Sequence, residues 1–111
     1  MPATAPAPIA AHPVLLRLRA ELERLYGDRL VRVLLYGSRA RGEARPDSDW
    51  DVAVILAGYD GTLPEHYRLA DLSFDLMQET GELLTLMPFA PEELERETLL
   101  MENIREEAVP I

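Results

Sequence analysis

The sequence predicts an α/β fold of the α+β kind, with a small mixed β-sheet flanked by helices. Three short apolar runs, at 30–36, 50–57 and 83–89, have the length and the β-branched or aromatic content of strands. Around them lie segments whose apolar residues recur every three or four positions, as on one face of a helix. The order along the chain is α-β-β-α-β-α, which implies one sheet covered by helices.

The N-terminal part of the chain divides into a tail and a helix. Residues 1–12 are rich in Ala and Pro, and we expect a flexible tail there, so that the folded domain spans residues 13–111. Pro13 suits the first position of a helix, which the sequence predicts to end at Gly27. The apolar positions of this helix have helical spacing: Val14, Leu15, Leu18, Leu22 and Leu25.

The middle of the chain predicts two strands joined by a polar segment. The first strand, 30–36, runs directly into Gly37 and Ser38, and residues 38–41 are expected to open a short helix or turn. Pro46 and Asp47 interrupt the chain before the second strand at 50–57.

The C-terminal half predicts a helix, a strand and a last helix. Thr62 is placed to cap the first of these helices, and Glu65 stands three residues later, as in a capping box. That helix is expected to end at Gly81. Pro91 begins the last helix, which is expected to continue to about Glu106.

Composition narrows the class of protein. With 111 residues, 48% of them hydrophobic, the chain forms one domain with a real core. The net charge of −9 argues against direct nucleic-acid binding and suits docking to a basic protein. No apolar run reaches the roughly 20 residues of a membrane span, so no membrane partner is expected. The chain has no cysteine, which fits a reducing, cytoplasmic location.

The segment from Tyr36 to Gly42, Y-G-S-R-A-R-G, has the residue types of a phosphate site. Gly37 allows the backbone to approach a phosphate closely, and Ser38 supplies a hydroxyl and an N–H group. Arg39 and Arg41 carry permanently charged, planar guanidinium groups that suit phosphate oxygens. We therefore predict that Gly37, Ser38, Arg39 and Arg41 hold a polyphosphate, such as that of a nucleotide.

Two carboxylates follow at a spacing that indicates a metal site. Asp49 and Asp51 are two residues apart at the start of a strand, so their side chains are expected to point to the same face, with Trp50 pointing to the other. Paired carboxylates repel unless a cation lies between them. Magnesium prefers one or two carboxylates together with substrate phosphates. We predict Asp49 and Asp51 as catalytic, metal-binding residues, with Mg²⁺ as the cofactor.

The string G-S-R-A-R-G-x-x-x-x-D-S-D-x-D resembles the signature of the minimal nucleotidyltransferases of the polymerase-beta-type nucleotidyltransferase superfamily. The resemblance implies the nucleotidyltransferase fold and a Mg²⁺-dependent transfer of a nucleotide from an NTP such as ATP to a hydroxyl. By it, Gly37 and Ser38 contact the phosphates, and Asp49 and Asp51 ligate the metal. It also implies an antitoxin role opposite a HEPN-type ribonuclease toxin, which some family members inactivate by AMPylation of a tyrosine.

The sequence departs from the superfamily at a third carboxylate, which normally lies on a later strand and helps to deprotonate the acceptor. Thr85 stands at the expected position, and Glu82 is a poorly placed substitute. Two alternatives follow. One is a catalytically weak or inactive module that neutralises a partner by binding. The other is an antibiotic-modifying enzyme, which ranks lower because the chain lacks the additional helical domain that such enzymes usually carry.

Overall fold

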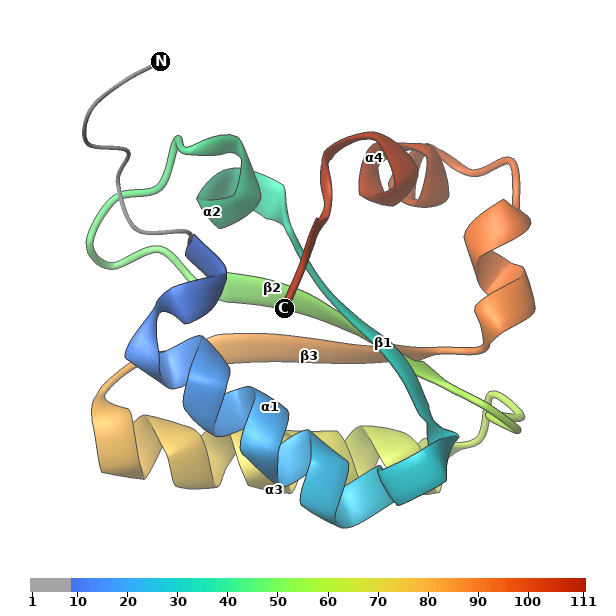
Figure 1. The fold of residues 1–111 in the computed structure, drawn as a ribbon, viewed down its shortest axis with the longest axis horizontal. Helices are drawn as coiled ribbons and strands as arrows, with labels where there is room; N and C mark the ends of the chain where they lie inside the picture. The colour runs from blue at the N-terminus through green and yellow to red at the C-terminus, as the bar shows by residue number, and fades with distance from the viewer. Residues whose placement is uncertain (1–8) are drawn as a thin grey trace.

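The computed structural model describes residues 9–111 and contains a four-stranded mixed sheet with helices on both faces (Figure 1). The strands are β1 (Leu30–Tyr36), β2 (Trp50–Leu56), β3 (Leu84–Phe89) and β4 (Val109–Pro110). The α-helices are α1 (Pro13–Tyr26), α2 (Gly37–Arg41), α3 (Leu63–Thr80) and α4 (Leu99–Glu107). Short 3-10 helices are η1 (Ile9–Ala11), η2 (Gly27–Arg29) and η3 (Pro91–Glu95). The predicted fold class is confirmed.

The strand order is β3-β2-β1-β4, with β1 antiparallel to both of its neighbours and β2 parallel to β3. The register places Asp51, near the start of β2, opposite Tyr36, the last residue of β1. On the other side, Asp51 stands opposite Thr85 of β3. The sheet therefore brings the end of the first strand, the start of the second and the start of the third to one edge.

Two apolar clusters hold the layers together. On one face, α1 and α3 pack against alternate residues of the sheet, among them Val33, Trp50 and Val52. On the other face, α4 contributes Met101 and Ile104 against Leu34, Ala53 and Ile55. Figure 1 shows α1 and α3 together on one side of the sheet and α4 on the other. Among residues 9–111, no helix combines the length and the apolar character that crossing a bilayer requires.

Regular structure is present before the predicted domain boundary at residue 13. Residues 1–8, most of the predicted tail, lie outside the described residues. Ile9–Ala11 form η1, and His12 caps α1 by accepting a hydrogen bond at Nδ1 from the Val14 N–H (3.2 Å). The His12 ring packs against Trp50 with 4.5 Å between the ring centroids.

The capping box predicted at Thr62 and Glu65 is wrong, although α3 begins and ends where expected. The Thr62 hydroxyl donates to the Asp60 carboxylate (2.6 Å). Glu65 instead accepts hydrogen bonds from the Tyr26 hydroxyl (2.8 Å) and the Arg29 guanidinium (3.1 Å). Tyr26 is buried, so its hydroxyl needs a partner, and that demand outweighs a local cap.

The last predicted helix is divided in two. η3 ends at Glu95, and Arg96 has extended backbone angles (φ −70°, ψ 146°). Thr98 then caps α4, because its side chain accepts a hydrogen bond from the Met101 N–H (3.2 Å). The chain ends in β4, which extends the sheet beside β1.

Candidate active site

Gly37 lies against the carboxylate of Asp51. The backbone of Gly37 has a φ of 75°, and a Cβ added to it would lie 2.4 Å from Asp51 Oδ2. Any side chain at this position would therefore displace Asp51 as well as strain the backbone. The sequence predicts that the Gly37 backbone approaches a phosphate. The structure adds that the absence of a side chain at Gly37 makes room for Asp51, a predicted metal ligand.

Asp49 and Asp51 lie close enough to influence each other. Asp49 is exposed and immediately precedes β2, whereas Asp51 is half-buried within it. Burial raises the pKa of the Asp51 carboxyl, the neighbouring charge of Asp49 raises it further, and the charge of Arg41 opposes both effects. The ionised form of Asp51 is therefore disfavoured unless a cation lies nearby.

This donor set fits magnesium. Among the described residues, no three His, Asp or Glu side chains come together as a metal cluster. Two carboxylates alone suit Mg²⁺, which retains water or phosphate ligands in its remaining positions. Asp49 and Asp51 are the residues that would hold it.

Ser38 lies in the first turn of α2, directly after the end of β1. Backbone N–H groups in a first turn have no partner inside the helix, so those near Ser38 are free to meet an anion. The helix is closed after one turn, because the Ser38 carbonyl accepts hydrogen bonds from the Gly42 and Glu43 N–H groups. The predicted short helix at this position is confirmed, and it places Ser38 directly after the glycine that lies against Asp51.

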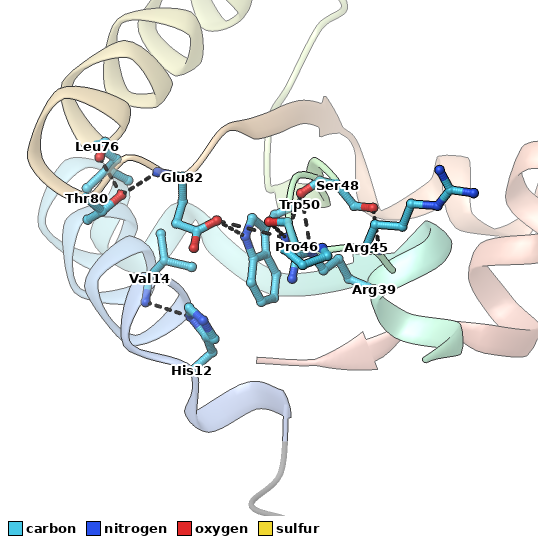
Figure 2. A network of polar contacts seen from close by, with 10 residues as sticks. All are labelled: His12, Val14, Arg39, Arg45, Pro46, Ser48, Trp50, Leu76, Thr80 and Glu82. Carbon is cyan, nitrogen blue, oxygen red and sulfur yellow. Dashed lines mark hydrogen bonds and ion pairs between the residues drawn. The ribbon is translucent and has the colours of Figure 1, made fainter. Parts of the chain in front are cut away.

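The two predicted phosphate-binding arginines are both engaged with other groups of the protein. Arg39 reaches into the loop before β2, where it donates to the carbonyls of Pro46 (3.2 Å) and Ser48 (2.8 Å), as Figure 2 shows. Arg41 is exposed and pairs with Glu43 and Glu107. Its charge still lowers the pKa of Asp51, so Arg41 lies within electrostatic reach of the acidic site. Arg39 is committed to the protein in this structure.

Tyr36 is a neighbour of the site that the sequence did not single out. Its side chain is half-buried, and its pKa is raised by burial and then by the charge of Asp51. Only the pairing of β1 with β2 brings the two residues together, because they are 15 positions apart (51 − 36). The motif itself had suggested only that Tyr36 ends the strand.

The third side chain beside Asp51 is Thr85, which stands opposite it in the parallel register and is exposed. Glu82 does not replace the missing carboxylate. Its Oε2 accepts a hydrogen bond from Trp50 Nε1 (3.0 Å), and Trp50 points to the face of the sheet opposite to Asp51. The site therefore has two carboxylates and a threonine.

Comparisons with known proteins agree with this geometry. The sequence pattern of the family described as "Nucleotidyltransferase domain" matches residues 15–110. A solved structure described as a minimal nucleotidyltransferase is 34% identical, with a TM-score of 0.52. The match covers 91% of this chain and 99% of the other chain. No curated protein matches the sequence.

Two solved toxin–antitoxin structures share the fold. One is a complex with AMP-PNP, at 22% identity and a TM-score of 0.59. The other is the toxin–antitoxin MntA-HpeT with two aspartates changed to glutamate, at 19% identity and a TM-score of 0.59. Each match covers 85% of this chain and 69% of the other. At these identities the likeness establishes the fold alone.

The contact at Gly37 predicts that Gly37→Ala is more damaging than the same change at another glycine of similar backbone conformation. Gly42 has a φ of 74° and nothing within 4 Å of an added Cβ, so Gly42→Ala carries only the backbone strain, about 1 kcal/mol. Gly37→Ala also displaces the Asp51 carboxylate and should cost about 1 kcal/mol more. Chemical denaturation of both variants measures the difference. Equal losses of stability would show that the clash is absent.

The acidic site predicts that Asp51→Asn stabilises the metal-free protein. Folding raises the pKa of Asp51, so the folded state gains stability as the pH falls through that pKa, and a neutral side chain should give the same gain at neutral pH. Thermal denaturation in EDTA should show a melting temperature higher by a few degrees. Asp75→Asn, in the exposed part of α3, is the control and should have little effect. An Asp51→Asn protein that melts at or below the wild-type temperature contradicts this account.

Proposed function

This chain belongs to the nucleotidyltransferase domain family, in the group of minimal nucleotidyltransferases, and from this premise we propose that it is a Mg²⁺-dependent protein adenylyltransferase. It transfers AMP from ATP to a hydroxyl group, a tyrosine, of a partner protein. The partner is a HEPN-type ribonuclease toxin, and its AMPylation makes this chain the antitoxin. A cytoplasmic location fits the need for ATP and the absence of cysteine.

The contact between Gly37 and Asp51 is the observation that carries this proposal. It brings the turn expected to bind a triphosphate against the carboxylates expected to bind the metal. Asp49 and Asp51 would hold Mg²⁺, which when bound supplies charge neutralisation and alignment of the reacting oxygens. The backbone of Gly37 and Ser38 would hold the triphosphate beside them.

In the transfer, the acceptor oxygen forms a bond to the α-phosphorus of ATP, and the bond from that phosphorus to the leaving pyrophosphate breaks. The hydroxyl also loses its proton, which passes to water because Thr85, opposite Asp51, has no basic group to accept it. A tyrosine, with a reference pKa of about 10, gives up its proton more readily than an aliphatic alcohol. The lack of a base at Thr85 therefore favours a tyrosine as the acceptor.

The structural neighbours support the nucleotide and the partner. One toxin–antitoxin complex was solved with AMP-PNP, which has the triphosphate length of ATP. In the MntA-HpeT mutant, the two substituted aspartates are separated by one residue, as Asp49 and Asp51 are here. The net charge of −9 on this chain also suits a basic protein partner.

The second candidate is a binding module that neutralises the toxin without chemistry. Thr85 favours it, because loss of general-base assistance typically slows a reaction by about 10²–10⁴. The two candidates differ in what the carboxylates do. A binding module needs neither Asp49 nor Asp51 for neutralisation.

Label transfer separates these candidates. We expect the wild-type chain, incubated with Mg²⁺, α-labelled ATP and a toxin partner purified in its absence, to label the toxin. Asp49→Asn should abolish the labelling and the neutralisation together, because it removes one of the two metal ligands. Asp75→Asn serves as the control and should label normally. A toxin that stays unlabelled, or one that Asp49→Asn neutralises fully, excludes the adenylyltransferase.

Restoring a third carboxylate should increase the rate. Thr85→Asp places a basic group opposite Asp51, and we expect transfer to speed up by at least about tenfold. Thr85→Asn has the same shape without the charge and should give no gain. Initial rates of labelling at saturating ATP and Mg²⁺ measure both variants. If Thr85→Asp is no faster than Thr85→Asn, proton removal at this position does not limit the reaction.

A further inference from the structure

Trp50 is the only tryptophan of the chain and lies between the two predicted metal ligands, yet its side chain faces away from them. The indole is fully buried, with 0% exposure. Its N–H group needs an acceptor in that environment and donates to Glu82 Oε2 (3.0 Å). Figure 2 shows this bond within a polar network that also includes Arg39 and Thr80.

Arg39 connects this network to the segment that carries Asp49. Its guanidinium carbon lies 4.1 Å from the centroid of the Trp50 ring, a cation–π arrangement. The guanidinium donates to the carbonyls of Pro46 and Ser48 and lies 3.9 Å from Glu82 Oε2. The Arg39 side chain is only 14% exposed, so its contacts are with protein groups rather than with solvent.

Each end of the network is attached to a fixed part of the fold. The Glu82 N–H donates to Thr80 Oγ1 (3.1 Å), and the Thr80 hydroxyl donates to the Leu76 carbonyl (2.7 Å), which ties Glu82 to the last turn of α3. At the other end, the loop is closed by the bond from the Arg45 N–H to the Ser48 Oγ (2.9 Å). Arg39 therefore holds the loop before β2 through the carbonyls of Pro46 and Ser48.

We propose that Arg39 and Glu82 are positioning residues that fix the loop before β2, so that Asp49 and Asp51 meet the phosphate-binding turn in the geometry that the metal needs. This inference rests on the proposed function. Arg39 lies in α2, two residues after Gly37, and bonds the residue that directly precedes Asp49. The Arg39 guanidinium thus joins the turn at Gly37 to the loop that carries Asp49. Glu82 lies 3.9 Å from this guanidinium and orients it.

The chemistry of the two side chains favours positioning over simple stabilisation. The Arg39–Glu82 ion pair is long, at 3.9 Å, and Glu82 is partly exposed, so the pair itself contributes little stability. The planar fork of Arg39, by contrast, fixes direction, because it bonds Pro46 and Ser48 at once and stacks on Trp50. Groups that orient metal ligands typically change metal affinity by about 10- to 100-fold when they are replaced.

Calorimetry of Mg²⁺-dependent AMP-PNP binding tests the proposal, using the full chain well below its melting temperature. Arg39→Lys keeps the charge but loses the fork, and Glu82→Gln keeps an acceptor for Trp50 but loses the charge. We expect each to weaken binding by about 10- to 100-fold. The double variant should be little worse than either, because both act through one network.

A matched Arg–Glu pair elsewhere provides the control. Arg17 and Glu79 join α1 to α3 through two exposed hydrogen bonds (2.9 and 3.2 Å), on the helices that cover the face of the sheet opposite to Asp51. Arg17→Lys and Glu79→Gln should leave nucleotide binding unchanged. Acrylamide quenching of the Trp50 emission, a second readout, should increase in the Arg39 and Glu82 variants and not in the controls.

The outcomes are distinguishable. Wild-type binding with unchanged affinity in the Arg39 and Glu82 variants overturns the positioning role and leaves the proposed function standing. Loss of binding in Arg39→Lys with none in Glu82→Gln also overturns it, since Arg39 would then act on phosphate directly. Failure of the wild-type chain to bind Mg²⁺ and AMP-PNP together overturns the proposed function itself, and the positioning role with it.

Discussion

The absence of a side chain at Gly37 allows β1 to end against the carboxylate of Asp51. The antiparallel register places the residue before Gly37 opposite Asp51, so the chain turns into α2 beside a half-buried acid. A Cβ at Gly37 would occupy the space of the Asp51 oxygen. The position of Ser38 follows from this approach, whereas the proximity of Asp49 follows from its spacing of two residues from Asp51.

This arrangement disfavours the charged form of Asp51, and the fold offsets only part of that effect. Burial and the charge of Asp49 both raise the pKa of Asp51, and Arg41 offsets only part of the effect. On the opposite face of β2, Trp50, Arg39 and Glu82 form a network in which the indole N–H and the guanidinium both have acceptors. One face of β2 therefore carries a carboxylate whose charge is only partly offset, which suits a metal. The other face carries Trp50, whose indole N–H has an acceptor, and this face holds the strand in place.

The sequence was sufficient to predict what depends on local pattern. Alternation within a strand separated Asp51 from Trp50, and the run ending at Tyr36 predicted a turn at Gly37. It was not sufficient for roles set by contacts across the sheet. Arg39 has the chemistry of a phosphate ligand, and only the fold shows its guanidinium bound to the carbonyls of the loop before β2. Likewise, only the fold shows that the Glu82 carboxylate, just after α3, accepts a hydrogen bond from Trp50 and does not face Asp51.

A crystal structure of the wild-type chain with AMP-PNP and Mn²⁺, located by its anomalous scattering, tests the central claim most directly. The account predicts one metal ion in contact with the carboxylates of Asp49 and Asp51, with phosphate oxygens of the nucleotide completing its shell above Gly37 and Ser38. A nucleotide seated elsewhere on the sheet, or a metal bound without either aspartate, would contradict it.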